Sequence, residues 1–166
     1  GNYHKKDSHM NDAYVGDIGD YGKYGMLRFV GEATGLRLGI VWMKTANPTF
    51  EYLGRDKLVD CDRGLHQTLM GLVQSSQRTI AGVEGSGAFP AETVYFNKML
   101  DFRSVKADRQ MEFRSEWFNE ARNCLETAGL VFFDPDNGME TSSTKPGKIQ
   151  GPKNVRYDEI EPFYKG

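Results

Sequence analysis

The chain of 166 residues contains only two cysteines, three histidines and six prolines. Cys61 and Cys124 lie far apart and no secretion signal precedes them, which excludes a disulfide-stapled secreted domain. We expect both to be reduced thiols, buried as small apolar residues. No apolar run approaches the roughly eighteen residues that a membrane span needs, so no membrane segment is predicted. We therefore expect a cytoplasmic protein.

Neither sign of charge dominates, since 21 Lys and Arg stand against 23 Asp and Glu, for a net charge of −2. This balance excludes a protein that binds nucleic acid through bulk charge, although it leaves room for a local basic patch. Apolar residues make up 39% and aromatic residues 12% of the chain, which is typical of a globular domain and not of a disordered one.

The ends of the chain bear on its domain organisation. Residues 1–10 have no periodicity, and Ser8-His9-Met10 is typical of a cloning scar, so we assign them to a tag. His66 is then the only native histidine, which excludes a catalytic group or a metal site that needs two or more histidines. We expect residues 11–166 to form a single α/β domain. Because the chain ends just after a predicted strand, we expect that domain to be incomplete at its C-terminus.

The most informative stretch is Leu130–Gly138. Four apolar residues predict a short strand buried on both faces, and Asp-Pro-Asp-Asn-Gly follows at once. Pro135 favours an extended Asp134, and Asn137-Gly138 is a strong turn signal. A buried strand therefore delivers two carboxylates to the edge of a sheet, where open α/β sheets bind their ligands. An ordinary polar turn is the alternative interpretation.

The rest of the chain alternates helices with strands. Four glycines at intervals of three predict a loop near Gly16, and Asp20 is expected to cap a helix that ends at Gly35. Strands are also predicted over 36–43, 93–99 and 154–160. Helices are predicted over 63–74 and 116–128, directly after Asp62 and Ser115, and loops over 44–50 and 141–151. This order predicts a three-layer, Rossmann-like α/β domain with a mainly parallel sheet.

Two segments resemble those of a known family. Gly16–Tyr24, followed by an apolar helix, resembles the Gly-Asn-x-Ala-Asp-x-x-Lys-His signature of adenine-N6 methyltransferases of ribosomal RNA, and Leu130–Pro135 resembles the strand before their Asp-Pro-Pro-Tyr motif. The chain is also similar to bacterial and phage proteins of unknown function that share Gly-Asp-x-Gly-Asp-x-Gly-Lys-Tyr-Gly and Asp-Pro-Asp-Asn-Gly.

The resemblance implies a methyltransferase-like fold and S-adenosylmethionine as cofactor, with nucleic acid as the partner. It implies cofactor-binding roles for Asp17, Asp20, Lys23 and Tyr24, and catalytic roles for Asp134, Pro135, Asp136 and Asn137. In that family the Asp and a proline carbonyl accept hydrogen bonds from the amine to be methylated. Here Asp136 and Asn137 replace Pro and Tyr, and no acid or glycine-rich turn follows the strand over 36–43.

Two other functions are compatible with the sequence. Asp134, Asp136, Asp158 and Glu159 could converge on Mg²⁺ or Mn²⁺ in a nuclease or phosphodiesterase, with Lys153 neutralising the developing charge. Alternatively, the chain is a non-catalytic binding protein on a degenerate enzyme fold. The sequence leaves the oligomeric state open.

Overall fold

The structure, a computed structural model, describes residues 15–43, 59–75, 77–140 and 151–164. The tag assigned to residues 1–10 and the loops expected over 44–50 and 141–150 lie outside the described residues. The described chain is a mixed α/β fold around a small parallel sheet. No helix among these residues is long and apolar enough to cross a membrane.

The sheet has the strand order β2-β1-β3, with β1 (Leu38–Trp42) between β2 (Val94–Phe96) and β3 (Leu130–Asp134). Both pairings are parallel, and Trp42 at the carboxyl end of β1 lies opposite Asp134 at the carboxyl end of β3. All five residues of β1 are buried, as expected for a central strand with both faces covered. The predicted strands over 36–43 and 93–99 are confirmed, each somewhat shorter than expected. The strand expected from Leu130 is also present, but the expectation that it is buried on both faces is wrong: all five residues of β3 are half-buried, because β3 pairs with β1 on one side and has no described strand on the other.

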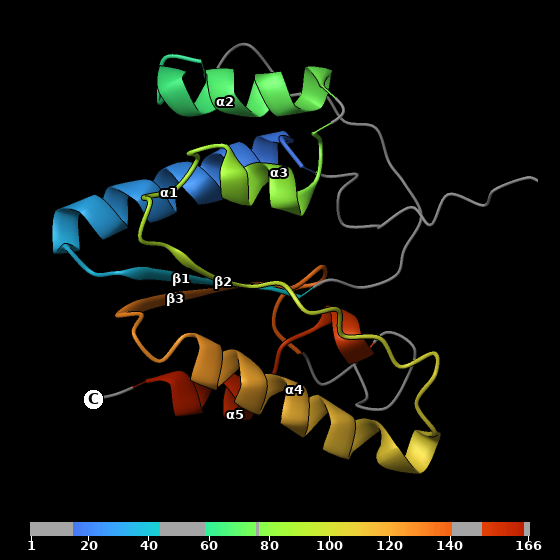
Figure 1. The fold of residues 1–166 in the computed structure, drawn as a ribbon. Coiled ribbons are helices and arrows are strands. Elements are labelled where there is room, and N and C mark those ends of the chain that lie inside the picture. Colours follow the sequence, from blue (N-terminus) through green and yellow to red (C-terminus); the bar gives the residue numbers. More distant parts are fainter. Residues whose placement is uncertain (1–14, 44–58, 76, 141–150, 165–166) are drawn as a thin grey trace, which may run out of the picture.

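Helices cover both faces of this sheet (Figure 1). On one face lie α1 (Ile18–Thr34) and α3 (Ile80–Gly85), with α2 (Arg63–Gln74) packed outside them, and on the other lie α4 (Gln110–Cys124) and α5 (Tyr157–Ile160). Short 3-10 turns are η3 (Ala107–Arg109), η4 (Gly151–Lys153) and η5 (Glu161–Phe163). The mixed α/β fold and the parallel sheet that the alternating pattern predicted are therefore confirmed.

The core consists of two apolar clusters, one on each side of the sheet. Because side chains alternate along a strand, Leu38, Ile40 and Trp42 pack toward α1, while Val41 and Met43 join the cluster beneath α4. A Cβ at Gly39 would lie 2.7 Å from Leu125 Cδ2, so glycine is what lets the end of α4 approach the sheet.

Two helix predictions are confirmed in detail. α2 spans the predicted residues, and Asp62 caps it by accepting a hydrogen bond from Leu65 N at 2.9 Å. α1 ends at Gly35, whose φ of 66° is the left-handed conformation of a helix C-cap.

Three local predictions are wrong. α1 is capped by Asp17 and not by Asp20, and α4 begins at Gln110 and ends at Cys124, not over 116–128. The strand expected over 154–160 is absent: only Val155 forms a bridge, to Met139, and α5 follows. There the Arg156 N–H donates to Glu159 Oε2 at 2.9 Å, which turns the chain into a helix.

The cysteines also differ from expectation. Cys61 and Cys124 are free, as predicted, but both are exposed and not buried. Cys61 immediately precedes the cap of α2. Cys124 is the last residue of α4, where its thiol lies 3.5 Å from the Tyr95 carbonyl oxygen of β2 and stays open to solvent.

Candidate functional site

A cavity of about 420 Å³ lies where the carboxyl ends of β1 and β3 meet the N-terminus of α1. The next described helix after β1, α2, is on the α1 face of the sheet, whereas α5 after β3 is on the opposite face (Figure 1). The crevice between β1 and β3 is therefore a topological switch point, the place where open α/β sheets bind ligands. The cavity is lined by Val15, Asp17, Gly19, Asp20, Lys23, Tyr24, Trp42, Met43, Ile80, Asp134, Pro135, Asp136, Asn137 and Lys153.

The N-terminus of α1 holds two of these acids in place. Asp17 Oδ1 accepts from Asp20 N at 2.8 Å, which caps the helix. Asp20 Oδ2 accepts from Gly16 N at 3.1 Å, which satisfies an amide just before the helix. Gly16 has a φ of 83°, so a side chain there would be strained. Asp20 is thereby held 95% buried at the cavity wall, since its exposed fraction is 5%.

The second part of the site comes from β3. Leu130 and Phe132 pack into the cluster on the α1 side, so the alternation of the strand places the Asp134 side chain on that side as well. Lys23 Nζ lies 2.8 Å from Asp134 Oδ1 and 3.0 Å from Asp20 Oδ1. One ammonium therefore joins the two segments on which the methyltransferase resemblance depends.

Burial and charge shift the protonation equilibria of this group. Burial raises the pKa of the Asp20 carboxyl to about 6, and the neighbouring Lys23 ammonium only partly offsets this. Burial by itself would lower the pKa of Lys23, but the charges of Asp134 and Asp20 outweigh it and raise that pKa. Burial, followed by the charges of Asp20 and Asp134, raises the pKa of the Tyr24 hydroxyl, which stays protonated.

The Asp-Pro-Asp-Asn-Gly segment forms the turn that the sequence predicted. Gly138 N donates to Pro135 O at 3.5 Å, and Gly138 has a φ of 76°. Asn137 N donates to Lys153 O at 2.8 Å, which ties the turn to η4 and brings Lys153 to the cavity. Asp136 and Asn137 are exposed at its mouth. The segment is thus a structural turn whose side chains also line the cavity.

Sequence reasoning missed Trp42. This residue is 2% exposed and lines the cavity, yet within the part of the chain that the structure describes its buried Nε1 has no hydrogen-bond partner. Its ring packs edge-on against Tyr24, with ring centroids 6.1 Å apart. A buried donor without an acceptor is costly, which makes this N–H a candidate contact for a ligand atom. A tryptophan at the carboxyl end of a central strand was the only signal in the sequence.

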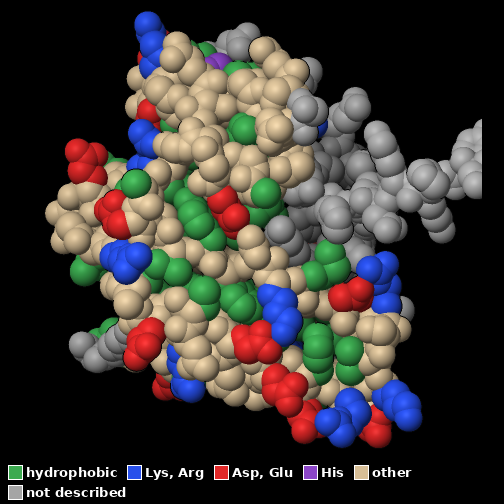
Figure 2. Space-filling model, in the orientation of Figure 1, with side chains coloured by type: hydrophobic (Ala, Val, Ile, Leu, Met, Phe, Trp, Pro, Cys, Tyr) green, Lys and Arg blue, Asp and Glu red, His purple; other side chains and the backbone are tan. Residues whose placement is uncertain are grey.

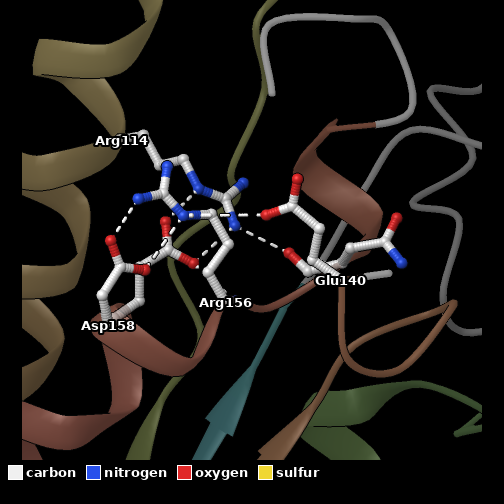
Figure 3. Close-up of polar contacts among 6 residues, drawn as sticks. Arg114, Glu140, Arg156 and Asp158 are labelled. Carbon is white, nitrogen blue, oxygen red and sulfur yellow. Dashed lines mark hydrogen bonds and ion pairs between the residues drawn. The ribbon is translucent and has the colours of Figure 1, made fainter. Parts of the chain in front are cut away.

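Asp158 and Glu159 are not at this cavity. Figure 3 shows Asp158 beside Arg114 and Arg156, and Glu159 is the next residue of the same helix, α5. Glu159 Oε2 accepts from Arg114 Nη2 at 2.8 Å, and Asp158 Oδ1 accepts from Arg156 Nε at 2.9 Å. Within the described ranges no group of three or more Asp, Glu, His or Cys side chains is arranged to hold a metal ion. The four acids of the metal hypothesis are therefore split between two places.

Comparison with known proteins adds no relative. No protein-family model matches the chain, and no curated protein sequence and no solved structure is significantly similar to it.

Proposed function

We propose that the chain is an S-adenosylmethionine-dependent, methyltransferase-like enzyme whose cofactor and acceptor meet in the cavity between β1 and β3. One observation carries this proposal: Lys23 from the Gly16–Tyr24 segment and Asp134 from the Leu130–Asn137 segment are in contact, on the wall of one cavity. The two motif-like segments are remote in sequence, and an accidental resemblance would give no reason for them to meet.

The topology supports the same proposal. The order β2-β1-β3 corresponds to the middle of the doubly wound order 3-2-1-4-5-6, with the reversal beside β1. In that architecture a nucleoside cofactor lies across the reversal, where this cavity is. We therefore propose that the observed sheet is the centre of a three-layer, Rossmann-like domain.

The lining of the cavity suits a cationic nucleoside. Four carboxylates, those of Asp17, Asp20, Asp134 and Asp136, stand against the two ammonium groups of Lys23 and Lys153. The acidic excess favours a sulfonium ion, and either lysine is a suitable partner for an amino-acid carboxylate. The orphan Trp42 Nε1 donor fits an acceptor atom of the ligand.

Methyl transfer asks mainly for positioning. When bound, S-adenosylmethionine supplies a methyl group whose carbon–sulfur bond breaks as the acceptor nitrogen bonds to the carbon, and the electron pair stays on sulfur. Asp134 orients that amine by accepting its N–H, with the Pro135 carbonyl beside it. Asp20 or Asp134 takes the proton that the nitrogen loses. Tyr24 and Trp42 form the apolar wall that excludes water.

Metal-dependent hydrolysis is the weaker proposal, because Asp158 and Glu159 bind arginines away from Asp134 and Asp136.

A nucleic-acid partner also stays a prediction. Figure 2 shows acidic and basic side chains interspersed over the face in view, with no continuous basic field of the kind that binds phosphates.

Calorimetric titration with S-adenosylmethionine tests the proposal. We expect micromolar affinity in the wild type and at least a tenfold loss in Asp134→Ala. Asp158→Asn, which removes an exposed acid outside the cavity, serves as the matched control and should bind normally. A parallel titration with Mn²⁺ distinguishes the alternative: metal binding lost in both variants, with no response to the nucleoside, would replace methyl transfer by hydrolysis. Silence toward both ligands would favour a non-catalytic protein.

A further inference from the structure

The Lys23 ammonium occupies a defined position in the cavity, between the carboxylates of Asp20 and Asp134, which we call the ammonium seat. Its Nζ lies 2.8 Å from Asp134 Oδ1 and 3.0 Å from Asp20 Oδ1, and it stands 6.0 Å from the centroid of the Tyr24 ring. Two carboxylates and one aromatic face are the groups that recognise a protonated amine. The Lys23 side chain therefore shows that a primary ammonium group fits this site.

The lysine is more free to leave than the seat is. The Lys23 side chain is 36% exposed, whereas that of Asp20 is 7% and that of Asp134 is 23% exposed. Asp20 is fixed by a backbone hydrogen bond from Gly16, and Asp134 ends a strand that is paired along its whole length with β1. A lysine stem of four methylene groups rotates readily toward water. The seat would keep its shape after the lysine left.

A second observation at the same cavity points to a ligand. Trp42 is 98% buried, since its exposed fraction is 2%, and its Nε1 donor has no partner among the described residues. Trp42 and Asp134 are opposite each other in the β1–β3 register, on adjacent strands. Trp42 and the ammonium seat therefore line one recess, and the unpaired donor is buried in its wall.

The charge of the recess also separates two kinds of acceptor. An excess of carboxylates over lysines attracts a cation and repels a polyanion. The stacking aromatic that would hold a flipped-out base is replaced here, because Asp136 and Asn137 follow Pro135. An uncharged nucleobase on a phosphate backbone gains little from such a site.

We infer that the acceptor of the proposed methyl transfer is a small primary alkylamine, which binds as its ammonium ion between Asp20 and Asp134 and displaces Lys23. One of these two carboxylates then takes a proton from the ammonium, so that the nitrogen lone pair can form the bond to the methyl carbon as the carbon–sulfur bond breaks. This inference rests on the proposed function for the transfer itself, whereas the ammonium seat is a statement about binding. Lys23 is then an internal competitor: it holds the seat in the free protein and yields it to the acceptor.

The first experiment uses the wild-type chain with labelled lysine side chains. NMR follows the Lys23 ¹³Cε and ¹⁵Nζ signals during titration with n-butylammonium chloride. We expect saturable shifts of Lys23 toward those of a solvated lysine, with no change at Lys98. Tetramethylammonium chloride, a cation without N–H donors, should leave Lys23 in place. Absence of a saturable effect of n-butylammonium, or equal effects of both cations, would overturn the inference.

The second experiment removes the competitor. If Lys23 holds the seat about nine-tenths of the time, its removal should raise the affinity for n-butylammonium about tenfold. We therefore expect Lys23→Met to gain about tenfold and Asp134→Asn to lose at least as much. Lys98→Met, which breaks the exposed ion pair with Glu120, is the matched control and should change nothing. A Lys23→Met protein that binds the amine no better would contradict the competitor role, and the wild-type titration decides the matter if that variant does not fold.

Failure of this inference and failure of the proposed function are distinguishable. S-adenosylmethionine binding without an amine response would overturn the ammonium seat and leave methyl transfer standing. Displacement of Lys23 by the amine without binding of the nucleoside would support the seat and overturn the proposed function.

Discussion

Lys23 and Asp134 are 111 positions apart in sequence, and their Nζ and Oδ1 atoms are 2.8 Å apart. The contact joins the first turns of α1 to the carboxyl end of β3. Asp20 shares the same ammonium at 3.0 Å, so three side chains form one charge-coupled group at the cavity.

Asp134→Asn should lower the free energy of unfolding by about 1–2 kcal/mol. The ion pair is half-buried, so its loss should cost more than that of an exposed pair but less than that of a fully buried one. Urea unfolding of the wild type and the variant measures the difference. Glu120→Gln provides the comparison, because the Lys98–Glu120 pair has about half of each side chain exposed and should contribute less. Equal losses in the two variants would contradict a special role for the Lys23–Asp134 pair.

Asp20 should make stability fall as pH rises. Its carboxyl has a pKa of about 6 in the folded chain against an ordinary value of 3.8. Between pH 4 and 6 the unfolded chain loses this proton first, so the folded state binds more protons and its stability falls with increasing pH. The two values differ by about two, which corresponds to about 3 kcal/mol.

The free energy of unfolding is measured across that pH range in the wild type and in Asp20→Asn. The value for the wild type minus that for the variant should fall up to pH 6 and stay constant above pH 7. Asp101 supplies the opposite sign, because its hydrogen bond with Arg103 lowers the pKa of its carboxyl. The ionised Asp101 therefore contributes stability at neutral pH that the wild type loses as pH falls, and Asp101→Asn should lack this contribution. A pH-independent difference for Asp20→Asn would refute the raised pKa.

Arg114→Met should destabilise the chain by about 3–5 kcal/mol. The guanidinium is 5% exposed, pairs with Glu159 and donates to Asn154 O at 2.7 Å, so its removal leaves a largely buried carboxylate without its partner. The same contacts hold the segment that carries Lys153, so hydrogen exchange over 153–160 should rise.

Arg103→Met tests the specificity of that effect. Arg103 pairs with Asp101 at the surface, with 71% of its side chain exposed, and its removal should cost no more than about 1 kcal/mol. Replacing Glu159 by Leu together with Arg114→Met should recover part of the loss, because no unpaired charge is then buried. If the double variant recovered no stability, the loss in Arg114→Met would come from missing packing contacts and not from the unpaired Glu159 carboxylate.

The two tryptophans should respond differently to replacement by phenylalanine. Trp117 Nε1 donates to Lys98 O at 3.0 Å, whereas none of the described residues accepts a hydrogen bond from the Trp42 donor. Both changes remove buried volume, but only Trp117→Phe also breaks a hydrogen bond. We expect Trp117→Phe to cost about 1 kcal/mol more in thermal or urea unfolding. Trp42→Phe alone should weaken S-adenosylmethionine binding, and unchanged binding would remove Trp42 from the site.

Local chemistry made part of the fold predictable. Asp62 before an apolar 3.6-residue period defined α2, and Asn137-Gly138 after an apolar strand defined the turn, because both depend on residues close in sequence. The start of α4 was missed because polar residues such as Gln110 give no apolar period. The strand expected over 154–160 failed because Glu159 accepts hydrogen bonds from the Arg156 N–H and from Arg114 of α4, and the second contact joins residues that are remote in sequence.

The sequence by itself determined an α/β chain with parallel strands, the glycine-rich start of α1 and a pair of acids at the end of β3. Only the tertiary structure decided which of these residues meet. It placed Lys23 between Asp20 and Asp134, turned the orphan indole of Trp42 toward the same recess, and gave Glu159 to Arg114 instead of to a metal site. Each of these contacts joins different elements, and their distances depend on how helices pack on the sheet, which no local pattern encodes.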